Sequence, residues 1–136
     1  AVRDKAGERI LKLSDTNTSP DILPNRYRQL ADIIRFYKPE CILESGAWNG
    51  GRAIEMALSA FKHQDKVHYI GFDLFEDGTT ETDHIEFNVK PHNTIQAVRN
   101  RLEEFTKHIK DKDNKTFTFE LYKGNVRETL DRMTLP

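Results

Sequence analysis

The sequence has one cysteine and no long hydrophobic run, and each shortage removes a class of protein. Cys41 alone cannot form an intramolecular disulfide or a cysteine-based metal cluster, which favours a reducing, cytoplasmic setting. The apolar runs stay far below the roughly 18 residues that a membrane span needs. Residues 1–13 alternate charged and apolar side chains and lack the apolar core of a signal peptide. We therefore expect neither a membrane-spanning nor a secretory segment.

An excess of charge of either sign is also missing. The chain has 21 Lys and Arg against 22 Asp and Glu, a formal net charge of -1. This balance argues against nucleic acid and anionic membranes as partners. With 136 residues, of which eight are Phe, four Tyr and one Trp, the chain is expected to fold as a single domain. A short segment and a turn-rich loop occupy residues 1–24.

Hydrophobic spacing predicts alternating helices and strands. Helical spacing indicates a docking helix that Asn25 caps, a second helix after residue 51, and a long helix over 95–109. Strands are predicted for 41–44, 67–72 and 116–122, the last as an edge strand, and a partial helix for 126–133. The segment 76–93 has no clean period and is expected to be a long loop.

This order predicts an α/β domain with a Rossmann-like parallel sheet and flanking helices. Because such sheets bind ligands outside the carboxyl ends of their strands, the residues of interest follow the three strands. After the first strand come Glu44 and the turn 46–51, in which Gly46 and Gly50 let backbone approach a ligand. The glycines also fit a simple tight turn. The Glu44 carboxylate can pair with a ligand ammonium or a bridging water, or else accept hydrogen bonds from nearby backbone N–H groups.

The second and third strand ends add polar residues. Asp73 follows Gly71 and Phe72, where an acid can accept hydrogen bonds from both hydroxyls of a ribose, although it also fits a helix cap or turn. Leu74 can flank a base. Gly124 and Asn125 can present an amide to an adenine edge, and they are equally a common turn pair.

Together these residues resemble the class I S-adenosylmethionine-dependent methyltransferases, in particular the macrocin O-methyltransferase group. The segments that carry the resemblance are ILESGAWNGGRA (42–53), YIGFDLFED (69–77) and LYKGNVRETL (121–130). It implies a methyltransferase that uses S-adenosylmethionine and acts on a small molecule, with a hydroxyl as the acceptor. The family's catalytic acids usually lie at and beyond a fourth strand, so no catalytic residue is named.

The resemblance also implies a role for each site residue. Glu44 and the backbone of Gly46, Ala47, Trp48 and Asn49 would hold the methionine part of the cofactor, Asp73 the ribose and Leu74 the adenine. Gly124 and Asn125 would face the adenine amino group, where the family often has Asp. Trp48 occupies the position of the middle glycine in the family's acid-x-Gly-x-Gly-x-Gly motif, so it either covers the site or points into the core.

Two other functions compete with this one. A nicotinamide-dependent oxidoreductase fragment is disfavoured, because the G-x-G-x-x-G motif is not met and Glu44 would repel a pyrophosphate. A nucleoside-binding or oligomerisation module without turnover is the main alternative. The predicted sheet stops after three strands and leaves residues 41–44 as an open edge, so we expect either a truncated domain or a homo-oligomer that covers this edge.

The loop 76–93 is the remaining candidate for chemistry. Six acids occur between Asp73 and Val89 without a Lys or Arg, but their spacing matches no calcium loop, so we predict no metal site. A solvated loop that can face the substrate fits better. His84 and His92 are weak candidates for a general base, since neither has a partner visible in the sequence.

Overall fold

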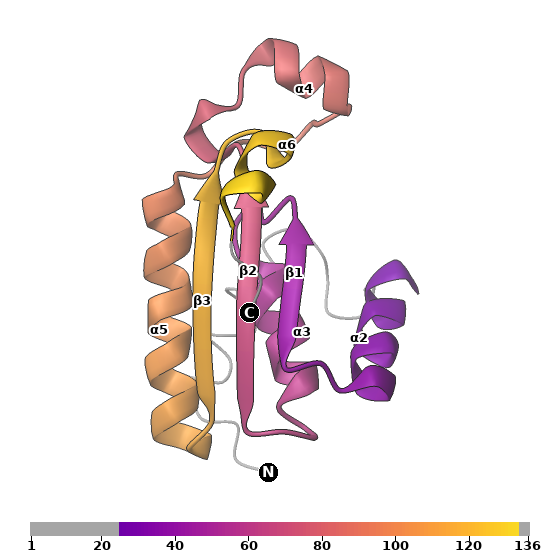
Figure 1. Cartoon of the computed structure of the whole chain (residues 1–136), viewed down its shortest axis with the longest axis vertical. Helices are drawn as coiled ribbons and strands as arrows, with labels where there is room; N and C mark the ends of the chain where they lie inside the picture. The colour runs from indigo at the N-terminus through magenta and orange to yellow at the C-terminus, as the bar shows by residue number, and fades with distance from the viewer. Residues whose placement is uncertain (1–24, 134–136) are drawn as a thin grey trace.

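The computed structural model describes residues 25–133, which form a three-stranded parallel sheet with flanking helices (Figure 1). The strands are β1 (Cys41–Ser45), β2 (Lys66–Asp73) and β3 (Thr116–Lys123), in the spatial order β1-β2-β3. Helix α3 (Gly51–Ala60) connects the first two strands and α5 (Ile95–Asp113) precedes the third. The predicted Rossmann-like α/β arrangement is thus confirmed. The segment and loop expected before Asn25 lie outside the described residues.

One face of the sheet carries the hydrophobic core. Side chains from alternate strand positions pack there against α3 and α5, as the period of two in strands requires. The predicted helical spacing of residues 95–109 is confirmed, because its apolar members are buried. No helix among the residues described is long and apolar enough to cross a membrane. The main buried residues are Ile42, Val67, Tyr69, Phe117, Ile54, Ala57, Val98, Leu102, Phe105 and Ile109.

Helix α2 (Asn25–Tyr37) packs against α3 beside the sheet (Figure 1). Its described residues begin at Asn25, the residue predicted to cap it. Of the predicted apolar face, Ile34 is buried, whereas Ile33 is 51% and Tyr37 72% exposed. Within the described part of the chain, α3 therefore covers only part of that face.

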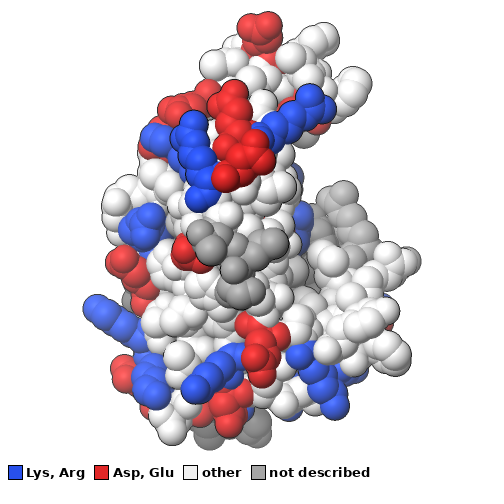
Figure 2. Space-filling model, in the orientation of Figure 1, with Lys and Arg blue, Asp and Glu red and all other residues white. Residues whose placement is uncertain are grey.

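The opposite face of the sheet is apolar near the strand ends and polar farther down. Ile70 and Phe72 are buried, and α6 (Val126–Thr129) contacts β2 on this side. Farther down, the His68 ring lies 2.7 Å from the Thr118 hydroxyl and 2.8 Å from the Glu120 carboxylate. Figure 2 shows that acidic and basic side chains are interspersed on the side of the molecule turned to the viewer.

The prediction of an unbroken loop over residues 76–93 was wrong. A short 3-10 helix, η1 (Phe75–Asp77), is followed by helix α4 (Thr80–Glu86), which lies beyond the carboxyl ends of the strands (Figure 1). A capping box holds its start, in which the Thr79 hydroxyl accepts from the Thr82 amide and the Thr82 hydroxyl accepts from the Thr79 amide. None of its residues is buried, so the helix has no apolar period to detect.

Candidate functional site

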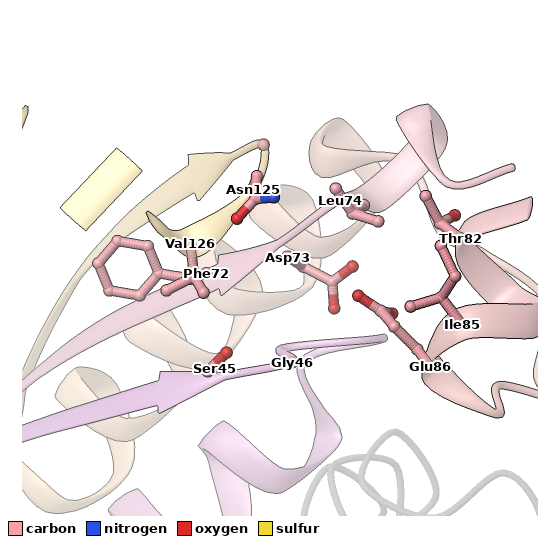
Figure 3. A pocket seen from close by; sticks show the side chains of 11 residues that line it. Ser45, Gly46, Phe72, Asp73, Leu74, Thr82, Ile85, Glu86, Asn125 and Val126 are labelled. Carbon is pink, nitrogen blue, oxygen red and sulfur yellow. The ribbon is translucent and has the colours of Figure 1, made fainter. Parts of the chain in front are cut away.

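A cavity of about 430 Å³ lies where all three strands end, with α4 as one of its walls (Figure 3). This volume is within the range of small-molecule sites. The geometry follows from the parallel sheet, because the carboxyl ends of parallel strands meet at the same edge. The lining residues are Ser45, Gly46, Phe72, Asp73, Leu74, Thr82, Ile85, Glu86, Gly124, Asn125 and Val126.

The residues singled out from the sequence divide into two groups. Members from all three strand ends come together in the cavity wall: Gly46, Asp73, Leu74, Gly124 and Asn125. The others are not part of this wall: Glu44, Ala47, Trp48, Asn49 and Gly50. They belong to the turn between β1 and α3 and to the core face beneath it.

Asp73 ties the first two strand ends together. Its Oδ2 accepts a hydrogen bond of 2.8 Å from the Trp48 amide, and its Oδ1 accepts one of 2.8 Å from the Phe75 amide. The carboxylate therefore fixes both the glycine turn and the turn after β2, which is the turn role considered for it. A carboxylate has about four acceptor positions, so two bonds leave capacity for a ligand in the cavity.

The amides of the glycine turn donate to protein oxygens. Gly46 and Ala47 both donate to the Phe72 carbonyl, at 2.7 and 3.1 Å, which continues the β1–β2 pairing past Ser45. The first helical amide, that of Gly51, donates to the Asn49 side-chain oxygen at 2.8 Å. The amides of Gly46, Ala47 and Gly51 thus have protein acceptors in this structure.

Left-handed backbone explains the pattern of the glycine motif. Gly46, Trp48 and Gly50 have φ angles of +89°, +48° and +80°. Trp48, at the position of the middle glycine, therefore adopts a conformation that normally favours glycine. Its indole Nε1 donates to the Pro91 carbonyl at 3.0 Å, and the Lys90 ammonium lies 4.1 Å from its ring centroid. Trp48 thus neither covers the cavity nor points into the core, but ties the turn to the segment that follows α4.

Glu44 is buried, with 8% exposure, and protein groups satisfy it. The Tyr69 hydroxyl donates to Oε1 at 2.8 Å, and Arg52 lies 3.4 Å from Oε2. The bond between Tyr69 and Glu44 needs a glycine at position 71, the cross-strand partner of Glu44. A Cβ at Gly71 would lie only 2.8 Å from the Tyr69 hydroxyl. Burial raises the pKa of Glu44, although the bonds from Tyr69 and Arg52 oppose the rise. Among the described residues its partners are the Tyr69 hydroxyl and the Arg52 guanidinium.

The third strand end is a capped turn. The Gly124 amide donates to the Asp73 carbonyl at 3.0 Å, and Gly124 has a φ of +130° that other residues rarely adopt. Asn125 then caps α6, because its side-chain oxygen accepts from the Arg127 amide at 3.0 Å. The turn reading of this pair is correct, and both residues also face the cavity.

Several lining residues were not found from the sequence. Thr82, Ile85 and Glu86 come from α4, and Figure 3 shows the Glu86 carboxylate directed toward Asp73. The signal in the sequence was the pair Thr79 and Thr82, a capping pattern before a helix without an apolar face. Among the described residues that line the cavity there are two carboxylates, those of Asp73 and Glu86, and no Lys, Arg or His. The described part of the wall therefore carries a negative charge.

The segment after α4 contains a hydrogen-bonded acid and histidine. His92 Nε2 lies 2.6 Å from Asp83 Oδ1, and Asn88 donates to the same oxygen at 2.9 Å. Bonds from Asn88 and His92 lower the pKa of Asp83. His92 also packs on Gly78, where a Cβ would clash with the ring. His92 thus has a partner after all, but neither it nor His84 lines the cavity. Among residues 25–133, no group of three His, Cys, Asp or Glu side chains is placed to hold a metal ion.

No protein-family model and no curated protein sequence matches the chain. A solved structure does resemble it: the SAH-bound methyltransferase PaMTH1 of Podospora anserina, with a TM-score of 0.52 and 14% identity. The alignment covers 93% of this chain and 44% of that chain, so the present sequence spans less than half the length of that enzyme. At this identity the likeness concerns the fold alone. The chain has a Rossmann-like α/β fold that it shares with a methyltransferase.

Proposed function

We propose that this chain is the cofactor-binding part of an S-adenosylmethionine-dependent methyltransferase that acts on the hydroxyl of a small molecule. The observation that carries the proposal is the negatively charged cavity at the three strand ends, in a fold shared with a methyltransferase that was solved with SAH. The assignment to a macrocin O-methyltransferase-like group rests on the sequence segments that carry that resemblance. The assignment of a hydroxyl as the methyl acceptor rests on the same resemblance.

The cavity residues suit an adenosine-containing ligand. Asp73 is held by two backbone amides and keeps acceptor capacity for a pair of ribose hydroxyls. Leu74 offers an apolar surface to a base, and Asn125 offers an amide from the neighbouring strand end. The glycine turn contributes shape, since a Cβ built at Gly46 meets no atom within 4 Å and would project into open space.

The charge of the cavity favours this cofactor over a nicotinamide dinucleotide. Asp73 and Glu86 are the charged residues in the part of the lining that the structure describes. A pyrophosphate would be repelled there, because phosphates need cationic side chains or free backbone amides. S-adenosylmethionine carries a sulfonium and an ammonium, which a negative wall attracts.

When bound, S-adenosylmethionine would supply a sulfonium methyl group for in-line transfer to the acceptor oxygen, with S-adenosylhomocysteine as the leaving group and the hydroxyl proton passing to a base or to solvent. The residues of this chain would bind the nucleoside through Asp73 and Asn125 and keep it aligned, and alignment is the protein's main contribution to such a transfer. None of the described residues is assigned as the base that takes the acceptor proton.

Calorimetric titration tests the proposal. S-adenosylhomocysteine should bind saturably with one site per chain, whereas NAD should give no heat of binding. NAD binding in the absence of S-adenosylhomocysteine binding would reject the proposal and favour the oxidoreductase. A methyl-transfer assay on the longest available gene product, with candidate hydroxyl acceptors, then tests turnover.

A binding or oligomerisation module without turnover is the second candidate. It is favoured by β1, which pairs only with β2 among the described residues and carries Leu43 at 46% exposure. Such an open apolar edge is a site for contact with another chain. Binding of S-adenosylhomocysteine without methyl transfer by the longest gene product would support this candidate.

A further inference from the structure

Helix α4 brings Glu86 to the cavity, although the helix buries none of its own residues. Most helices in proteins are held by an apolar face that packs on the core, and this face also fixes the direction in which each residue points. Such a face is missing from α4. Glu86 is nevertheless directed toward Asp73 in the cavity (Figure 3), so other contacts must set the rotation of the helix about its axis.

Asp83 makes such contacts, three residues before Glu86. Its Oδ1 accepts from the Asn88 side chain at 2.9 Å and lies 2.6 Å from His92 Nε2. Because an ionised carboxylate can only accept, Nε2 carries the hydrogen and donates it. Residues three apart are neighbours on a helix surface. A helix that is held at Asp83 is therefore also held at Glu86.

The chain after α4 turns back and brings His92 to this position. The helix ends at Phe87, which has a φ of +52°, and the Asn88 amide then donates to the Asp83 carbonyl at 2.8 Å. On its other side the His92 ring packs on Gly78, where a Cβ would clash with the ring carbon Cε1. His92 thus connects the segment that enters α4 with the helix itself.

We propose that His92 is a positioning residue of the candidate site: by donating to Asp83 it holds α4 so that Glu86 accepts a hydrogen bond from a hydroxyl or ammonium group of the bound cofactor. The inference rests on the proposed function and extends it to a residue outside the cavity. A carboxylate suits this role because it accepts from both kinds of donor. His92 acts through the helix, since it is not among the residues that line the cavity.

Two amide substitutions of His92 test the bond, with S-adenosylhomocysteine titrated by calorimetry into the full chain. The Gln side chain can place its NH₂ group near the position of Nε2, whereas the shorter Asn places it near that of Nδ1. We expect His92→Asn to bind the ligand about fivefold more weakly than the wild type, and His92→Gln to bind within about twofold of it. His84→Asn is the control, at an exposed position of α4 outside the cavity lining, and should bind like the wild type.

Gly78→Ala tests the same bond without changing a polar group. Gly78 has a φ of -60° and a ψ of 137°, which alanine adopts without strain, so the added Cβ acts by displacing the His92 ring. We expect Gly78→Ala to weaken binding by about fivefold as well. In a chain that already carries His92→Ala, the same substitution should change the affinity by less than about twofold, because the ring is gone.

Glu86→Ala separates positioning of Glu86 from general damage to the fold. If His92 acts through Glu86, the loss from His92→Asn should shrink to less than about twofold in a chain that carries Glu86→Ala. Urea denaturation of His92→Asn should give nearly the midpoint of the wild type, because α4 adds no buried residue to the core.

Three results would overturn the proposal while the proposed function stands. One is a His92→Asn variant that binds S-adenosylhomocysteine as tightly as the wild type. Another is a His92→Gln variant as weak as His92→Asn, since the Nε2 donor would then not matter. The third is an equal loss from His92→Asn with and without Glu86, because His92 would then act by another route. If the wild-type chain does not bind the ligand, the proposed function fails and this inference fails with it.

Discussion

At the scale of single residues, Asp73 is the most direct test of the site. Asp73→Ala removes the acceptor for the Trp48 and Phe75 amides and the proposed contacts to the ribose. We expect the affinity for S-adenosylhomocysteine to fall by about 1–3 kcal/mol. Calorimetry measures this at a temperature where circular dichroism shows the variant to be folded. Glu103→Ala, on the exposed side of α5, is the control, and an affinity that matches it would remove Asp73 from the site.

Glu44 leads to a prediction about pH. Its pKa is raised above the ordinary value of 4.5, mainly by burial, so the folded chain holds this proton more tightly than the unfolded chain. The stability from this group is fully present below the unfolded pKa and is lost as pH rises through the folded pKa. Glu44→Gln can still accept from Tyr69 and does not ionise.

Urea denaturation over a series of pH values compares the two proteins. The free energy of unfolding of the wild type minus that of Glu44→Gln should fall as pH rises above 4.5. Asp83 and Glu120 have pKa values that hydrogen bonds lower, so their contributions to stability increase with pH. Both proteins contain these two residues, so their contributions cancel in the difference. A difference that rises over this range would contradict the burial argument.

At the scale of elements, Trp48 connects the β1–α3 turn to the segment between α4 and α5. Trp48→Gly relieves the strain of a φ of +48°, about 1 kcal/mol, but removes the bond to Pro91 and the contact with Lys90. We therefore expect little change in global stability and faster hydrogen exchange in residues 88–93.

Trp48→Phe is the matched control for that experiment. It keeps an aromatic ring that can lie beneath Lys90 but loses the Nε1 donor and the second ring of the indole, so its exchange rates should lie between those of the wild type and Trp48→Gly. Unaltered protection of residues 88–93 in both variants would show that other contacts hold this segment.

The elements that the sequence predicted are those with an apolar period. Spacing identified β2, β3 and α5 because burial selects which residues are hydrophobic there. Helix α4 has no buried residue, and only the Thr79–Thr82 cap marks its start, so it was missed together with the lining residue Glu86. Residues at the ends of different strands lie together in the cavity wall, as expected for a parallel sheet, including Asp73 at the end of β2 and Asn125 after β3.

The partners of individual site residues were harder to predict. The Glu44–Tyr69 bond depends on the space at Gly71, which is a feature of strand register and not of local pattern. The left-handed backbone of Trp48 likewise depends on contacts with Asp73 and Pro91, far along the chain. Sequence spacing locates the site, but three-dimensional contacts decide which atoms remain available to a ligand.

At the scale of the whole molecule, the open side of β1 leads to a prediction about association. Leu43 is 46% exposed on a strand that pairs only with β2 in the described part of the chain. We expect the chain to associate through this edge, and light scattering after size-exclusion chromatography measures the mass. Leu43→Lys should shift the population toward monomer, because a charged edge resists pairing.

Val89→Lys is the control for the edge variant. Val89 is 95% exposed and lies outside the sheet, so the substitution adds the same charge to a different surface and should not change the mass. A wild-type chain that is monomeric at micromolar concentration would contradict the association.

The position of Trp48 has a practical consequence for all of these measurements. It is the only tryptophan in the chain, and its indole sits between a loop tied to the cavity wall through Asp73 and a loop that follows α4. The molecule therefore carries a single intrinsic fluorophore beside its candidate site. Emission spectra of the unlabelled protein can follow ligand titrations and local rearrangements there without a signal from any second indole.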